Sequence, residues 1–278
     1  MAGPRLSFST AALFPRDSAE CLALVARAGF DCAELMPQCF ADAGEGFAAR
    51  AERAGLPVGS VHYPLAMFSM LYNAHPGMAA EARAFGRGLV RLCSRLGAGV
   101  LVIHPHEPVS DAAQRAALES PVVDNIADLA EACEAAGVTL AMENNPKGPG
   151  RDPASLLAYI GSLAGRARLA PMVDTTEASE AGVDSARFIA EASPVHLHLS
   201  DHRGERKHLP AGEGAIDWAA VAASLRGYRG MYVLEPSYRY YLGEVEERLE
   251  SARAFAARLA AAAGAAKAGT ARPAEGAS

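Results

Sequence analysis

Short, nearly continuous apolar runs alternate along this chain with longer segments in which apolar residues recur every three to four positions. The short runs are rich in aliphatic and β-branched residues, which is typical of strands buried on both faces of a parallel sheet. The longer segments have the period of amphipathic helices, and several open with a Ser or Asp that predicts an N-cap. The predicted strands cover residues 6–9, 32–35, 58–62, 100–104, 138–143, 169–174, 195–199 and 231–235. The predicted helices cover residues 18–28, 45–54, 79–96, 120–136, 152–163, 184–191, 217–225 and 242–263.

Eight strands alternating with eight helices predict an α/β fold, a single (β/α)8 TIM barrel. The chain has 278 residues, and such a barrel typically takes about 250 as one domain. We therefore expect a barrel domain over residues 1–263 and a flexible Ala/Gly-rich tail over 264–278. The alternative is an open, doubly wound sheet, but its phosphate-binding G-x-G-x-x-G is missing after the first predicted strand.

The composition excludes several classes of protein. The net charge is −6, from 26 Lys and Arg against 32 Asp and Glu, and the sequence has no basic stripe, so a nucleic-acid partner is disfavoured. No run approaches the roughly 20 apolar residues of a membrane span, and the N-terminus lacks the apolar core of a secretion signal. The five cysteines are odd in number and include no C-x-x-C pair. We expect reduced thiols in a cytoplasmic protein.

Ionisable side chains occur at or next to the carboxyl ends of the predicted strands. They are Glu34, His62, His104, Glu143, Asp174, His198 and Glu235. In a barrel these ends converge at one rim, where the active sites of this fold lie. Carboxylates crowded together repel one another, and a bound divalent metal relieves that repulsion. The alternative interpretation is a buried network of ion pairs.

The predicted metal ligands are Glu143, Asp174, His198 and Glu235, which offer three carboxylates and one imidazole. This set suits Mn²⁺, Zn²⁺, Co²⁺ or Mg²⁺, and no thiolate at these positions favours a softer ion. Mn²⁺ is the favoured ion. Four protein ligands leave positions open on a six-coordinate ion, which is what Lewis-acid catalysis requires.

Six segments of the sequence resemble the xylose isomerase-like TIM barrel superfamily, over residues 6 to about 255. They are SVHYP (60–64), VIHPHEP (102–108), AMENNP (141–146), MVDTTEASEAG (172–182), HLHLSDHRGERKHLPAGEGAIDW (196–218) and YVLEPS (232–237). The superfamily includes sugar phosphate isomerases and epimerases, inosose isomerases and dehydratases, and the AP endonucleases of family 2. The resemblance implies that the same four ligands form the shared metal site. It also implies that Glu143 and Glu235 are the catalytic residues that move the substrate proton.

Three histidines and two departures bear on the choice between these activities. His62 and His104 resemble the histidines that, with the glutamate matching Glu143, hold another zinc in the endonucleases, and His208 resembles a further zinc ligand there. Glu177 stands where the pattern D-x-x-H has a histidine, and Arg206 stands where an aspartate ligand is expected. A guanidinium cannot ligate a cation, so a third zinc site is incomplete, while a two-metal site stays open.

The remaining predictions concern side chains around the site. The residues predicted to bind substrate are His62, His104, Asn145, Glu177, Arg206 and His208. We expect Glu34 either to accept a sugar hydroxyl or to form an internal salt bridge, and Asn144 to cap the turn before Pro146. His196 is expected to point away from His198, toward the helices. Asp201 lies on the loop that follows the predicted strand 195–199, where a solvated turn is as good an interpretation as a functional role.

These observations predict a divalent-metal-dependent isomerase or epimerase of a sugar, sugar phosphate or cyclitol. The metal would hold the carbonyl oxygen and an adjacent hydroxyl, and one glutamate would remove a proton to form a metal-stabilised enediolate. The substrate is expected to be a small polyhydroxylated carbonyl compound, and the resemblance suggests a homodimer or homotetramer. The alternatives are a metal-dependent phosphodiester hydrolase, a dehydratase of a hydroxylated ring, and a barrel that only binds a ligand.

Overall fold

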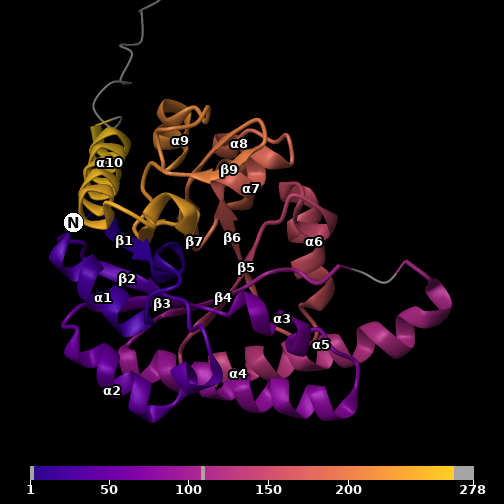
Figure 1. The fold of residues 1–278 in the computed structure, drawn as a ribbon. Helices are drawn as coiled ribbons and strands as arrows, with labels where there is room; N and C mark the ends of the chain where they lie inside the picture. Colours follow the sequence, from indigo (N-terminus) through magenta and orange to yellow (C-terminus); the bar gives the residue numbers. More distant parts are fainter. Residues whose placement is uncertain (1–2, 108–109, 266–278) are drawn as a thin grey trace, which may run out of the picture.

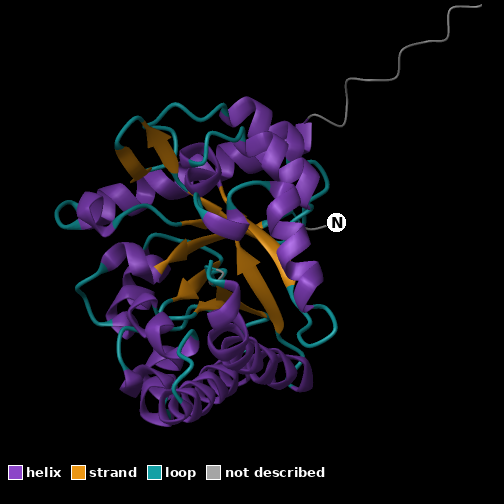
Figure 2. Cartoon of the chain, turned by 90° about the vertical axis from the view of Figure 1, so that its right-hand side faces the viewer, coloured by secondary structure: helices purple, strands orange, loops and turns teal. Residues whose placement is uncertain are grey.

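Eight parallel strands close into a barrel in the computed structural model, which describes residues 3–107 and 110–265. Around the barrel the order is β1-β10-β7-β6-β5-β4-β3-β2, and β1 closes the ring by pairing with both β10 and β2. Figure 2 shows the strands at the centre with helices packed around them. The strands are β1 (Arg5–Ser9), β2 (Cys32–Leu35), β3 (Val58–His62), β4 (Val100–Ile103), β5 (Thr139–Glu143), β6 (Ala170–Asp174), β7 (His196–Leu199) and β10 (Met231–Leu234). The predicted (β/α)8 fold is confirmed.

The helices follow the strands along the chain and form the outer layer, with α4 and α5 side by side and α10 beside β1 (Figure 1). The α-helices are α1 (Ser18–Arg27), α2 (Glu45–Arg53), α3 (Phe68–Leu71), α4 (Pro76–Leu96), α5 (Ala112–Ala135), α6 (Pro153–Leu163), α7 (Thr175–Glu180), α8 (Ser185–Ala192), α9 (Trp218–Ser224) and α10 (Val245–Ala265). In the described part of the chain, five short 3-10 helices lie between these elements: Thr10–Leu13, Phe40–Ala43, Leu65–Met67, Gly148–Gly150 and Tyr238–Tyr241.

Several elements differ from the sequence-based expectation, and the short helices α3 and α7 were not predicted. Helix α5 begins at Ala112 rather than at residue 120 and runs through Pro121. The connection between β7 and α9 contains an antiparallel hairpin of β8 (Asp201–Arg203) and β9 (Arg206–Leu209), which are too short to show a strand period. Helix α10 continues to Ala265, and the rest of the tail expected at 264–278 lies outside the described residues.

Alternation along each strand separates two kinds of side chain. Outward-facing residues join the large core between strands and helices, while two small apolar clusters fill the barrel interior. The interior clusters consist of Cys32, Met231, Val233, Val102, Ala141 and Met172, with Val100 packed against both. Further along the same inward faces the residues become polar, so the ionisable groups at the strand ends lie above an apolar floor.

Aspartate N-caps fix where several helices begin. The carboxylates of Asp17, Asp152, Asp174, Asp184 and Asp217 each accept a hydrogen bond from a backbone N–H in the first turn of the helix that follows. Such a cap satisfies a donor that the helix itself leaves unpaired. Asp174 differs from the other four because it is also the last residue of strand β6, which places its carboxylate at the mouth of the barrel.

Two further sequence-based expectations concern cysteines and membranes. All five cysteines are free thiols, and Cys39 alone is exposed. Among the described helices, none combines the length and the apolar character that crossing a bilayer requires.

Candidate functional site

Four side chains from four neighbouring parts of the barrel converge at its mouth. Glu143 ends β5, Asp174 ends β6, His198 lies in β7 and Glu235 directly follows β10. One ligand atom from each of the four lies within 4.8 Å of the others. Parallel pairing brings them together, because Asp174 is in register with His198 on the adjacent strand. These are the four residues that the sequence predicted as metal ligands.

The imidazole of His198 is the centre of this group. Its Nδ1 lies 2.9 Å from Glu143 Oε1 and 2.6 Å from Glu235 Oε2, and the ring is fully buried. The hydroxyl of Ser9 donates to the other oxygen of Glu235, at 2.9 Å. Burial alone would lower the pKa of His198, but the carboxylates of Glu235 and Glu34 outweigh burial and raise it well above its usual value. In the absence of a cation, a proton on Nδ1 of His198 therefore bridges Glu143 and Glu235, two of the groups that would ligate a cation.

The Asp174 carboxylate provides a test of whether a cation fits. Its Oδ1 accepts the backbone N–H of Glu177 at 2.9 Å, while its Oδ2 is buried without any hydrogen-bond partner. Burial raises the pKa of Asp174 to about 8; His208 offsets part of that rise and Glu143 adds to it. A buried carboxylate oxygen without a partner is costly, and a divalent cation among three carboxylates and one imidazole would satisfy it. The residues present fit the predicted metal.

A second group of potential ligands shares Glu143. His62 Nε2 lies 3.3 Å and His104 Nε2 lies 3.0 Å from Glu143 Oε2, the oxygen that faces away from His198. The other ring nitrogen of His62 lies 2.6 Å from the Tyr63 carbonyl and donates to it, so Nε2 is the atom available to a ligand. Burial would raise the pKa of Glu143, but His198 and His104 outweigh burial, so this pKa lies well below its usual value. Glu143 is thus ionised, with His198 next to one carboxylate oxygen and His62 and His104 next to the other.

A cavity of about 270 Å³ opens above these groups at the barrel mouth. This volume is close to the lower end of the range of about 300–1,000 Å³ found for small-molecule sites. Its polar lining consists of His62, His104, Glu143, Glu177, His208, Glu235 and Ser237, and its apolar lining of Ala11, Met36, Leu65, Pro236 and Tyr238. A lining that combines apolar side chains with a few polar groups is typical of a site for a small molecule.

Glu177 and His208 form a pair on one wall of this cavity. His208 Nε2 lies 3.0 Å from Glu177 Oε1, and the other ring nitrogen lies 3.2 Å from the hydroxyl of Ser200. Burial would lower the pKa of His208, but Glu177 raises it to about 9. The backbone of His208 has a φ of 46°, which is uncommon for a residue other than glycine.

Two predicted substrate-binding residues do not line the cavity. The side chain of Asn145 accepts the backbone N–H of Lys147 within its own turn, at 3.0 Å. The guanidinium of Arg206 lies over the ring of Tyr240, 6.0 Å from its centroid, on the exposed side of β9.

The expected orientation of His196 is wrong. Residues two apart in a strand point to the same face, and His196 lies inside the barrel with His198. Its Nε2 is 2.8 Å from Glu34 Oε2, and both side chains are fully buried. Of the two alternatives for Glu34, the internal ion pair is therefore the one observed.

The expected role of Asn144 is also wrong, because its buried side chain bonds to the backbone of Asp174 instead of capping a turn. The amide oxygen accepts from the Asp174 N–H at 2.6 Å, and the amide nitrogen donates to the Asp174 carbonyl at 3.1 Å. Asn144 thus links β5 to β6 beside two of the candidate ligands.

Asp201 is buried and is not part of a solvated turn. Its carboxylate accepts the backbone N–H groups of Gly212 and Ile216 and the indole N–H of Trp218, at 2.8–3.1 Å. A β-carbon at Gly214 would collide with this carboxylate. The segment that carries His208 into the cavity is therefore anchored by one aspartate. The sequence-based roles of Asn144 and Asp201 were therefore both incorrect, although the two residues lie inside the segments AMENNP (141–146) and HLHLSDHRGERKHLPAGEGAIDW (196–218).

The family model described as a xylose isomerase-like TIM barrel matches residues 22–259. The chain belongs to this family. A search of curated protein sequences gave no match.

Three solved structures superpose on 94–98% of the chain. An L-ribulose 3-epimerase is 22% identical with a TM-score of 0.76, covering 98% of this chain and 100% of its own. A D-tagatose 3-epimerase-like protein is 18% identical with a TM-score of 0.75, covering 95% and 100%. A xylose isomerase domain protein from Alicyclobacillus acidocaldarius subsp. acidocaldarius is 21% identical with a TM-score of 0.73, covering 94% and 99%. At these identities the similarity establishes the fold.

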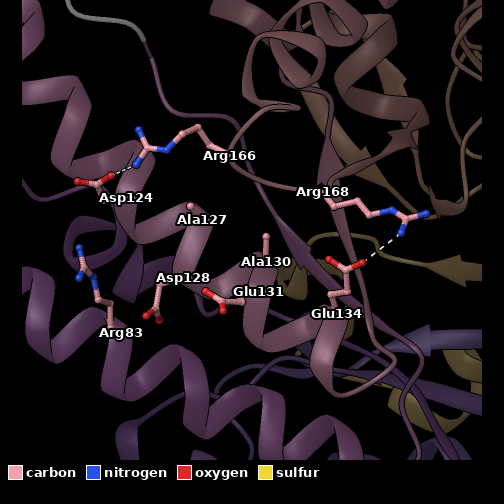
Figure 3. Close-up of a pocket in the computed structure, with 9 residues that line it drawn as sticks. All are labelled: Arg83, Asp124, Ala127, Asp128, Ala130, Glu131, Glu134, Arg166 and Arg168. Atoms are coloured by element: carbon pink, nitrogen blue, oxygen red, sulfur yellow. Dashed lines mark hydrogen bonds and ion pairs between the residues drawn. The ribbon is translucent and has the colours of Figure 1, made fainter.

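A larger depression on the outside of this xylose isomerase-like barrel lies far from the mouth. It has about 490 Å³ and is lined by charged residues of α4 and α5 and of the segment before β6 (Figure 3). Arg166 pairs with Asp124 and Arg168 pairs with Glu134 along this depression. Because these charges are exposed and compensate one another, we assign no chemistry to the depression.

Proposed function

We propose that this protein is a sugar isomerase or epimerase that moves a proton beside the carbonyl group of a small polyhydroxylated compound. The observation that carries the proposal is the convergence of three carboxylates and one imidazole within 4.8 Å, next to a cavity of about 270 Å³. Glu143 and Glu235 belong to both the ligand group and the cavity lining, so each can reach a bound molecule. Similarity in fold to sugar 3-epimerases supports the same class of reaction.

Glu143, Asp174, His198 and Glu235 would hold a divalent cation, with Mn²⁺ favoured over Zn²⁺, Co²⁺ or Mg²⁺ for this set of ligands. When bound, such a cation polarises a carbonyl group and stabilises the negative charge that develops on its oxygen. The residues themselves orient the sugar and exchange its proton.

The two glutamates would be the proton carriers. Ser9 donates to Oε1 of Glu235 and so orients that carboxylate toward the mouth. One of Glu143 and Glu235 would remove a proton from the carbon beside the carbonyl, and the other would return a proton to the opposite face or to the adjoining carbon. His104, Glu177 and His208 would bind substrate hydroxyls from the cavity wall.

The test follows the exchange of carbon-bound hydrogen with solvent. The protein, with Mn²⁺ added, is incubated in D₂O with a panel of ketoses and inosose-type cyclitols, and proton NMR records deuterium uptake and new products. E235Q is expected to lower the exchange rate at least about 100-fold, since general acid–base groups contribute about 10²–10⁴-fold. E246Q is the matched control, because Glu246 is exposed on α10, where it pairs with Arg27. Exchange by folded E235Q at the wild-type rate would contradict the proposal.

A phosphodiester hydrolase is the second candidate, and one observation favours it. His62, His104 and Glu143 form their own potential ligand group, which could hold a second cation beside the first. Glu177 and Arg206 depart from the endonuclease pattern, and the net charge of −6 disfavours a nucleic-acid substrate. More than one metal per chain together with cleavage of a duplex containing an abasic site would favour the hydrolase. One metal and no cleavage would exclude it.

A further inference from the structure

A buried carboxylate lies directly beneath the candidate metal site. Glu34, in β2, is fully buried inside the barrel. Its Oε2 accepts the hydroxyl of Ser60 at 2.9 Å and lies 2.8 Å from Nε2 of His196. Its Oε1 lies 2.8 Å from Nε2 of His198, the ring nitrogen opposite the one that faces Glu143 and Glu235.

Glu34 does not reach a substrate directly, because it is absent from the cavity lining. Placing an ionised carboxylate in a barrel interior is costly unless its charge is used by a partner. Oε2 is satisfied by Ser60 and His196, whereas neither Oε1 nor His198 Nε2 makes an aligned hydrogen bond to any atom of the described chain. At 2.8 Å the two atoms face each other as an ion pair, so each is the other's polar partner.

The contact between Glu34 Oε1 and His198 Nε2 affects which nitrogen of the imidazole carries the proton. A neutral imidazole carries one proton, and the nitrogen without it supplies the lone pair that binds a metal. An acceptor next to one nitrogen keeps the proton there and leaves the other nitrogen free. In His198 the acceptor Glu34 is next to Nε2, and the free nitrogen would be Nδ1, which lies next to Glu143 and Glu235.

We propose that Glu34 is a positioning residue that keeps a proton on Nε2 of His198, so that Nδ1 presents its lone pair to the cation. This inference rests on the cation site of the proposed function. Ser60 and His196 contribute by holding Oε2, which orients Oε1 toward His198. Glu34, His196 and His198 also form a group that could hold a metal ion, and the proposal assigns this group to the support of the site above it.

The first experiment measures Mn²⁺ affinity by isothermal titration calorimetry on the full chain. E34A is expected to raise the Kd by about 10–100-fold, the usual effect of removing a group that orients a metal ligand. E34Q keeps an acceptor oxygen but loses the charge, so its Kd is expected to fall between those of the wild type and E34A. S7A is the matched control: Ser7 is buried in the barrel and bonds to no member of the site, and its Kd is expected to stay within twofold.

The second experiment uses ¹⁵N-histidine NMR on the Zn²⁺-loaded protein, because Zn²⁺ is diamagnetic. The signal of His198, identified by its loss in H198Q, is expected to show protonated Nε2 and metal-bound Nδ1 in the wild type. That pattern is expected to persist in E34Q and to be lost in E34A. A purely structural role would lower stability in both variants without changing the Kd or this pattern.

The outcomes separate the two proposals. Wild-type affinity in folded E34Q and E34A, or a His198 ring bound through Nε2, would overturn the role of Glu34 and leave the proposed function standing. Absence of cation binding by the wild type would overturn the cation site, and the role of Glu34 with it. Two Mn²⁺ ions in the wild type and one in H196Q would show that the buried cluster is itself a metal site, which would also overturn the role of Glu34.

Discussion

Replacing Asp174 by asparagine is expected to stabilise the cation-free protein while abolishing its response to metal. The Asp174 carboxylate is fully buried, and Oδ2 has no hydrogen-bond partner. Asparagine has nearly the same shape, keeps an oxygen that can accept from the Glu177 N–H, and is a good N-cap residue. The substitution therefore removes the charge and preserves the cap of α7.

The magnitude follows from the pKa of this one group. Burial raises the pKa of Asp174 from 3.8 to about 8, so the folded protein binds a proton that the unfolded chain releases. The stability from this group is complete below about pH 4 and falls by about 1.4 kcal/mol per pH unit until about pH 8. At pH 7 the accumulated loss is up to about 4 kcal/mol, and D174N avoids it.

The assay is urea unfolding in EDTA between pH 5 and pH 8, repeated with saturating Mn²⁺. Wild type is expected to lose stability relative to D174N as the pH rises. A cation at 100 times its Kd should add about 2.7 kcal/mol to the wild type and nothing to D174N. The control is D184N, the same change at an exposed N-cap of α8, where the Asp184 carboxylate accepts from Arg187 N–H at 2.7 Å. Equal pH slopes for wild type and D174N, or stabilisation of D174N by Mn²⁺, would refute the reasoning.

Three further predictions concern the residues that hold the site in shape. Because Glu177 outweighs burial and raises the pKa of His208 to about 9, the stability from this pair is present below about pH 6.5 and lost as the pH rises through 9. Urea titrations should show this loss, at no more than about 1.4 kcal/mol per pH unit, in the wild type and not in H208Q. G214A is expected to lower the free energy of unfolding by about 2–4 kcal/mol, since its β-carbon displaces the Asp201 carboxylate from its buried donors; an unchanged Tm would show that the anchor is dispensable. N144A leaves the buried N–H of Asp174 unpaired and should cost about 1–3 kcal/mol in urea unfolding, and a cost below about 0.5 kcal/mol would contradict that assignment.

Much of the fold could be predicted from the sequence because the signals are local. The predicted strands 32–35 and 58–62 match β2 and β3, and the other barrel strands agree within one residue at each end. Where an apolar run ends in an ionisable residue, the sequence itself indicates where the strand ends. Helix α5 was predicted to begin too late, and the hairpin of β8 and β9 was missed, because neither the start of α5 nor these three- and four-residue strands carries a periodic signal.

For the candidate site too, some features could be predicted from the sequence and others depend on the tertiary structure. The sequence by itself determined that Glu143, Asp174, His198 and Glu235 stand at strand ends, because a parallel barrel collects such ends at one mouth. Only the tertiary structure decided that Glu34 and His196 lie beneath them, that Asn144 ties Asp174 in place, and that Asn145 and Arg206 stay outside the cavity. Which inward side chains touch depends on how the strands are staggered when the barrel closes, and that stagger is set by packing across the whole ring.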